Sequence, residues 1–178
     1  MTRTTFLLST AALTSLIGLG SCARAPAPAP SVRREAPAPP EPLQFFVGEW
    51  EGKNTAASGR KTTLRWRVAS TLGGRWLAGV AHVAELGVEA RDFLGVQGGR
   101  IVRVYVDNQG SRATMSSPGW QGTEMTFQGE VHGADGSRVR VREIVTRVDS
   151  NTLHERWERW SEGAWALMSE ETLHRTDD

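Results

Sequence analysis

The chain has 178 residues, of which 39% are hydrophobic and 23% charged, so its composition is that of a globular protein with one domain and additional segments. It contains 21 lysine and arginine residues against 20 aspartate and glutamate residues, which gives a net charge of +1. This balance gives no reason to expect nucleic acid as a partner, because domains that bind nucleic acid carry a clear basic excess.

Residues 1–22 predict a bacterial lipoprotein signal peptide. Arg3 supplies the positive start, and the apolar run that follows is too short to span a bilayer by itself. The run ends in Leu19-Gly20-Ser21-Cys22, which resembles a lipobox, and Cys22 is the only cysteine of the chain. The resemblance implies lipid attachment at Cys22 and anchoring in the cell envelope. Ala23 and Arg24 follow the cysteine instead of the Asp that signals retention in the inner membrane, so we expect the outer membrane, with the domain facing the periplasm. The alternative is ordinary secretion with an unused cysteine.

Residues 23–42 predict an extended tether between the anchor and the folded domain. Seven of the eight prolines of the chain lie in this stretch. Proline fixes φ and lacks the backbone N–H donor, so neither a helix nor a sheet is expected there. Alternating alanine and proline favour polyproline II, which makes a spacer. The folded domain is then residues 43–178.

From residue 43 onward the sequence predicts an all-β domain. Runs of about eight to ten residues alternate with short turns that are rich in Gly, Asn and Asp. The expected strands are 48–54, 61–69, 74–84, 89–97, 100–107, 111–117, 121–131, 137–148, 151–160 and 164–175. Such short turns join antiparallel neighbours. We expect a closed or nearly closed antiparallel barrel of 8–10 strands, because closure removes exposed sheet edges.

The domain begins with an apolar stretch that contains Gly48 and Trp50. Gly-x-Trp at the first strand resembles the opening of lipocalin-like barrels, in which an arginine of the last strand stacks on the tryptophan. The resemblance implies that Trp50 and Arg175 form a pair that closes the barrel. The alternative is a core tryptophan and a solvated terminal arginine.

Further motifs extend this resemblance over residues 43–176. In chain order they are Leu72-Gly73-Gly74-Arg75-Trp76-Leu77, Phe93-Leu94-Gly95, Val104-Tyr105-Val106-Asp107-Asn108-x-Gly110 and Leu173-His174-Arg175. Together with Gly48-x-Trp50 they resemble an uncharacterised bacterial family of lipocalin-like, calycin-type barrels. The family implies a fold but no catalytic residues. Val96-Gln97 stands where relatives usually have Tyr-Asp.

Haem is the one cofactor that this resemblance suggests as a possibility. The related nitrobindin-like barrels bind haem through one histidine, and His154 and His174 are the candidates here. Because His154 shares its strand face with Arg156 and Glu158, it is expected to point outward, and we expect no cofactor.

The tryptophans are the most suggestive candidates for a ligand site, because the chain has seven of them and one tyrosine. Four are expected on strands with their rings facing inward: Trp66, Trp76, Trp157 and Trp165. They predict a pocket for a small hydrophobic ligand. The alternative is that they only fill the barrel.

Glutamates gather in the last three expected strands: Glu143, Glu155, Glu158, Glu170 and Glu171. Ion pairs with nearby arginines on the outer face are the simpler interpretation. The alternative is a carboxylate inside the cavity, for which Glu171 is the best candidate. No metal-ligand spacing or nucleophile motif occurs. We therefore expect non-catalytic binding of a small hydrophobic ligand; the alternatives are an enzyme that uses a cavity carboxylate and a structural or interaction module of the envelope.

Overall fold

The structure, a computed structural model, describes residues 38–176. The predicted signal peptide with Cys22, and residues 23–37 of the predicted tether, lie outside the described residues. The strands are β1 (Gly48–Ala56), β2 (Lys61–Thr71), β3 (Trp76–Val83), β4 (Val88–Gln97), β5 (Arg100–Asp107), β6 (Arg112–Ser117), β7 (Glu124–His132), β8 (Arg138–Arg147), β9 (Thr152–Ser161) and β10 (Ala164–Arg175). Three short 3-10 helices are η1 (Glu41–Phe46), η2 (Leu72–Gly74) and η3 (Ala84–Leu86).

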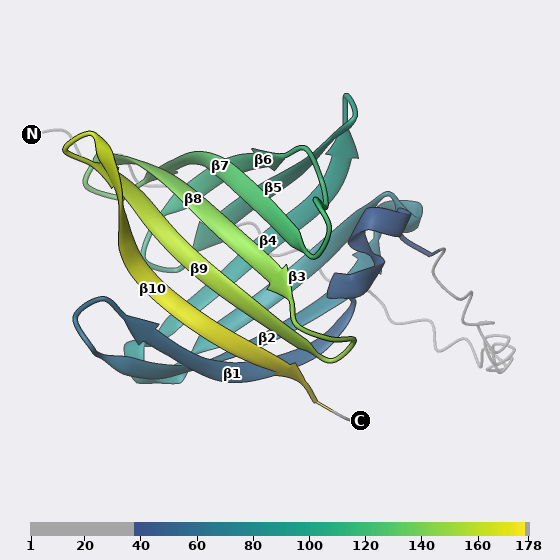
Figure 1. Cartoon of the computed structure of the whole chain (residues 1–178), viewed down its shortest axis with the longest axis horizontal. Helices are drawn as coiled ribbons and strands as arrows, with labels where there is room; N and C mark the ends of the chain where they lie inside the picture. The colour runs from purple at the N-terminus through teal and green to yellow at the C-terminus, as the bar shows by residue number, and fades with distance from the viewer. Residues whose placement is uncertain (1–37, 177–178) are drawn as a thin grey trace, which may run out of the picture. The chain divides into compact units, whose positions relative to one another are not determined.

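The ten strands form one closed antiparallel barrel (Figure 1). Each strand pairs with the next along the chain, and β1 pairs with β10 to close the ring. The predicted fold class is therefore confirmed, and all ten predicted strands are present. The largest difference at a strand end is at β7, which begins at Glu124 rather than at 121. Within residues 38–176, no helix has the length and apolar character needed to cross a membrane.

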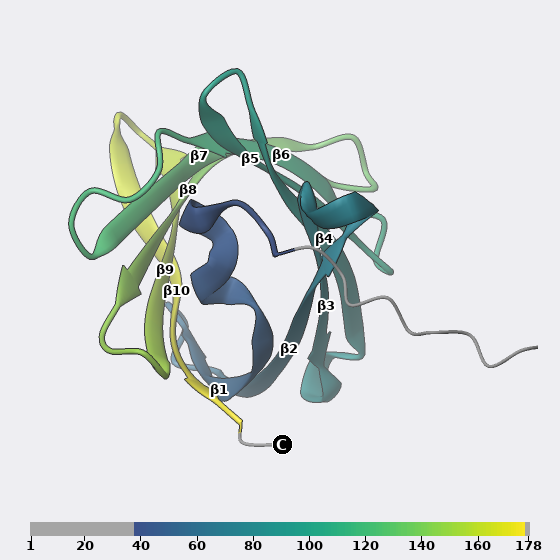
Figure 2. The same cartoon turned by 90° about the vertical axis from the view of Figure 1, so that its right-hand side faces the viewer.

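Helix η1 closes one end of the barrel. Figure 2 looks into this end and shows η1 inside the ring of strands. Leu43 and Phe46 of η1 are buried, and Phe46 stacks on Trp120 with ring centroids 5.7 Å apart. The indole N–H of Trp120 donates to the carbonyl of Pro42 at 2.8 Å, which ties the loop before β7 to the helix. The helix begins at Glu41, seven residues before the first strand.

The structure brings Trp50 and Arg175 together below this plug. The guanidinium of Arg175 lies 4.3 Å from the centroid of the Trp50 ring and donates to the carbonyls of Phe45 and Val47. Gly48 has a φ of 135°, and a Cβ at this position would overlap the Arg175 guanidinium. Gly48 thus gives both the backbone conformation and the space that the arginine needs. Arg175 thus connects the end of β10 to the segment that leads into β1.

Candidate binding cavity

A cavity of about 310 Å³ lies inside the barrel, at the end opposite η1. Val83 and Val88, which flank η3, and Ser111 in the turn between β5 and β6 lie around its mouth. Most of its wall is apolar: Leu64, Trp66, Ala81, Val83, Val88, Ala90, Tyr105, Ala113, Val131, Trp157 and Met168. The polar lining residues are Asn54, Arg103, Asp107, Ser111, Glu155, Ser169 and Glu171. This volume is at the lower end of the range for small-molecule sites.

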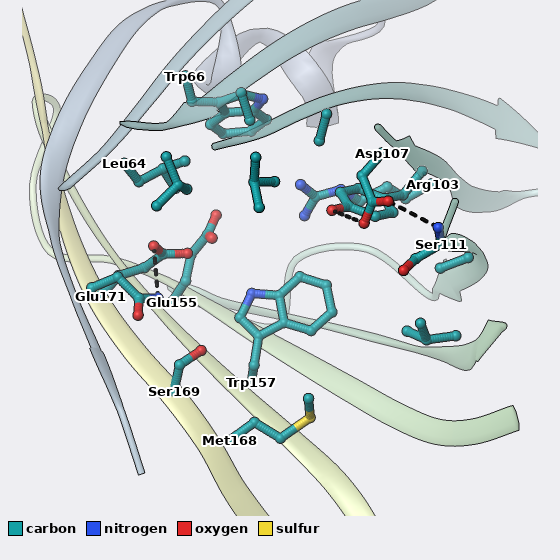
Figure 3. A pocket seen from close by; sticks show the side chains of 18 residues that line it. Leu64, Trp66, Arg103, Asp107, Ser111, Glu155, Trp157, Met168, Ser169 and Glu171 are labelled. Atoms are coloured by element: carbon teal, nitrogen blue, oxygen red, sulfur yellow. Dashed lines mark hydrogen bonds between the residues drawn. The ribbon is translucent and has the colours of Figure 1, made fainter. Parts of the chain in front are cut away.

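Arg103 of β5 and Trp66 of β2 form the floor of the cavity. Arg103, which Figure 3 shows in the cavity wall, is held by two buried carboxylates from other strands. Its Nε donates to Asp92 Oδ2 at 3.0 Å, and its Nη1 donates to Glu143 Oε1. The Trp66 indole N–H donates to the other oxygen of Asp92 at 3.3 Å. A Cβ at Gly79 would overlap Asp92 and Trp66, so this glycine leaves room for their contact.

A second acidic group lies on the adjacent wall. Glu155 of β9 and Glu171 of β10 are directly opposite each other in the antiparallel ladder, and both are buried. The amide of Asn54 donates to Glu171 Oε2 at 3.2 Å. Glu155 Oε1 is buried without a hydrogen-bond partner, and Figure 3 shows this side chain pointing into the cavity. Burying a carboxyl oxygen without a hydrogen-bond donor costs free energy, so the unpaired position of this atom needs an explanation.

Burial changes the protonation of these groups. It raises the pKa of Glu143 to about 8, although the positive charge of Arg103 opposes the shift. Burial also raises the pKa of Glu155 well above its ordinary value, and the neighbouring carboxyl of Glu171 adds to that effect. The pKa of Glu171 is raised by burial as well. Burial thus favours the neutral, protonated form of Glu143, Glu155 and Glu171.

A smaller polar group lies near the mouth. The Tyr105 hydroxyl donates to Asp107 Oδ2 at 3.0 Å, and Asp107 Oδ1 accepts the backbone N–H groups of Gln109 and Ser111. Burial raises the pKa of Tyr105, so its hydroxyl remains a donor. Asp107 is thus satisfied within its own turn and shapes the mouth.

Three of the five predicted pocket residues line the cavity: Trp66, Trp157 and Glu171. The structure corrects the other two. Trp76 lies on the outer face, where its ring covers Gly95. Trp165 also lies outside, packed against Trp160 at 5.2 Å between ring centroids, with Arg140 and Arg142 over its ring.

A β-bulge explains why Trp165 and Glu171 face opposite ways. The ladder shifts between Leu167 and Ser169, so Met168 is an additional residue in β10. Without the bulge, Trp165 and Glu171 would share a face, as the alternation in the sequence suggests. One extra residue reverses every side chain on one side of it.

The glutamates that the sequence places on one outer face are divided between two faces. Glu143, Glu155 and Glu171 are inside, whereas Glu158 and Glu170 pair outside with arginines of β8 and β9. The interpretation as outer ion pairs is thus correct for two of the five residues. Glu171 instead lies inside the barrel, as the alternative interpretation of a cavity carboxylate expected.

The two histidines considered for haem do not line the cavity. His174 is exposed and lies 3.3 Å from the Thr152 hydroxyl, and His154 alternates with the inward Leu153 and Glu155. Within residues 38–176, no group of three His, Cys, Asp or Glu side chains is arranged to hold a metal ion.

Arg103 and Asp92 were not predicted from the sequence. In β5, Ile101 and Arg103 face inward while Val106 on the other face is 45% exposed. In β4, Asp92 is buried while Phe93 is 41% exposed. The signal that could have found Asp92 is its alternation with Ala90 and Leu94, which are both buried.

Comparison of the chain with protein-family models gives no match, and comparison with curated proteins gives no match either.

Proposed function

We propose that this protein is a cell-envelope lipoprotein whose barrel binds a small, largely apolar molecule in its cavity without converting it. The observation that carries the binding function is the cavity itself. Its walls are mainly aliphatic and aromatic, and a few polar groups converge in it, as in small-molecule sites generally. The lipid anchor, the tether and membership in the uncharacterised calycin-type family rest on the sequence motifs alone.

Filling the cavity should remove binding. We expect the apolar fluorescent probe N-phenyl-1-naphthylamine, which is neutral at pH 7, to bind the wild-type domain and quench its tryptophan emission. Ala81→Leu places additional carbon atoms in the cavity and should weaken this binding by about tenfold or more, since cavity volume and apolar contact area are lost. Fluorescence titration measures the dissociation constant.

Ala78→Leu is the matched control, because Ala78 lies on the outer face of the same strand opposite Phe93. It should leave probe binding unchanged. A folded wild-type domain that binds no probe would contradict the proposal and favour a structural or interaction module of the envelope.

The anchor is tested separately. We expect Cys22→Ser to leave the precursor unprocessed or to release the protein from membranes, because no thiol remains for attachment of the lipid. Metabolic labelling with a palmitate analogue should mark the wild type only. Equal labelling of both proteins would refute the lipid anchor.

A second candidate is an enzyme that uses an inner carboxyl as a general acid or base, since carboxyls with strongly raised pKa values are typical of such sites. Chromatography of molecules that bind would distinguish the two candidates, because a binding protein returns its ligand unchanged.

A further inference from the structure

Acidic side chains outnumber basic ones around the cavity and its floor. Four buried carboxyls face one guanidinium: Asp92, Glu143, Glu155 and Glu171 against Arg103. Arg103 is already engaged by Asp92 and Glu143. Among residues 38–176, Glu155 and Glu171 therefore have no cation of their own: the amide of Asn54 donates to Glu171, and the two carboxyl groups share a hydrogen bond with each other.

The acidic pair, Glu155 and Glu171, also faces the cavity. Both glutamates line the cavity, and the unpartnered Glu155 Oε1 belongs to a side chain that is 3% exposed. In Figure 3 the carboxyl groups of Glu155 and Glu171 lie beside each other at the wall, with Trp157 next to them. A donor that enters the cavity can reach this oxygen without displacing any existing hydrogen bond to it.

We propose that the cavity takes an apolar amine in its ammonium form, with the charged end at Glu155 and Glu171 and the apolar body against Trp157, Leu64 and the aliphatic wall. This inference rests on the proposed function and specifies its ligand class. An ammonium group supplies both the missing charge and the missing donor. The indole face of Trp157 adds a cation–π contribution. Arg103 is already paired with Asp92 and Glu143, so a carboxylate ligand would add a third acidic group beside this one guanidinium.

Binding of the ammonium should release a proton. Because burial raises the pKa of both glutamates, the free pair holds protons that a bound cation displaces to solvent. Arg103, Asp92, Glu143 and Asn54 are the other charged or polar groups that act on this pair from neighbouring strands. The affinity for an amine should therefore rise with pH over the range in which the free pair loses its protons, by up to about tenfold per pH unit for one released proton.

A series of three probes tests the proposal by calorimetry: 2-phenylethylamine, 2-phenylethanol and 3-phenylpropionate. The wild type should bind the amine at least about tenfold more tightly than the alcohol at pH 8, with a smaller difference at pH 5, and should bind the carboxylate most weakly. Titrations in two buffers with different ionisation enthalpies should reveal the released proton. Equal affinity for amine and alcohol, or no proton release, would overturn the amine assignment while leaving apolar binding intact.

Glu155→Gln and Glu171→Gln should each reduce the amine affinity by about tenfold or more and leave the affinity for 2-phenylethanol within about twofold, since glutamine keeps the size but not the charge. Glu170→Gln, on the outer face of the same strand, is the control and should change neither. Undiminished amine binding in both inner variants would refute the site. If neither the amine nor the alcohol binds to a folded wild type, the proposed function itself fails.

Discussion

Replacing Arg103 by methionine should lower the free energy of unfolding by about 3–5 kcal/mol, because it leaves Asp92 and Glu143 buried without their cation. The loss should grow with pH. A carboxyl whose pKa is raised on folding stabilises the barrel fully below its unfolded pKa, and this contribution is lost as pH rises through the folded pKa. In the wild type this window runs from about 4.5 to about 8 for Glu143. Without Arg103 the window extends to higher pH.

Urea denaturation at pH 5 and pH 9 measures both effects. The deficit of the variant should be smaller at pH 5, where Glu143 is neutral in both proteins. Arg91→Met is the control, because Arg91 pairs with Glu89 at 2.8 Å on the outer face and both side chains are about half exposed. Such pairs contribute about 0–1 kcal/mol. A deficit for Arg103→Met that is the same at both pH values would show that the inner carboxyls do not depend on this cation.

Trp50→Ala should lower the free energy of unfolding by about 3–5 kcal/mol, because it opens a cavity between the barrel and η1. The ring is buried under Phe45 and Arg175, and its N–H donates to the Phe46 carbonyl at 2.9 Å. The variant therefore loses the apolar contacts and one of the hydrogen bonds that hold the plug in place.

A double-mutant cycle with Arg175→Ala tests the coupling of the two residues. Since Arg175 lies over the Trp50 ring, the two losses should differ from additivity by about 0.5–3 kcal/mol in thermal or urea unfolding. Trp160→Ala, on the outer face and 41% exposed, should cost only about 0.5–1.5 kcal/mol for its ring contact with Trp165. Strict additivity of the Trp50 and Arg175 losses would mean that their contact contributes nothing to stability.

Turns and alternation were sufficient to predict the barrel. Gly, Asn and Asp between short apolar runs indicate where antiparallel strands end, and these signals are local. The pair of Trp50 and Arg175 followed from a family resemblance, since nothing local connects two residues that are far apart in the sequence.

The polar interior was harder to predict, because two strands place their polar residues inside. Val106 of β5 and Phe93 of β4 are on the outer face, so hydrophobicity alone assigns the wrong face to Arg103 and Asp92. A buried arginine is stable there only because carboxylates from β4 and β8 surround it. Those strands come together only once the barrel has closed.

The bulge in β10 produced the error at Trp165. Alternation predicts that Trp165 and Glu171 share a face, and this holds until one residue is inserted into the ladder. No glycine or proline stands at Met168 to indicate the bulge. Its position depends on the pairing with β9 and is therefore not visible in one strand.

Because η1 seals one end, the barrel has the form of a cup, so a molecule bound in the cavity as we propose would enter and leave along the same path. By microscopic reversibility, an obstacle at the rim, such as a bulkier side chain at Val88 or Ser111 that does not touch the bound molecule, raises the barrier equally in both directions. Capture and escape then slow by the same factor, and the occupancy at equilibrium does not change. For the ligand binding that we propose, the rim would therefore set how long a molecule stays bound, and the inner wall would set which molecules bind.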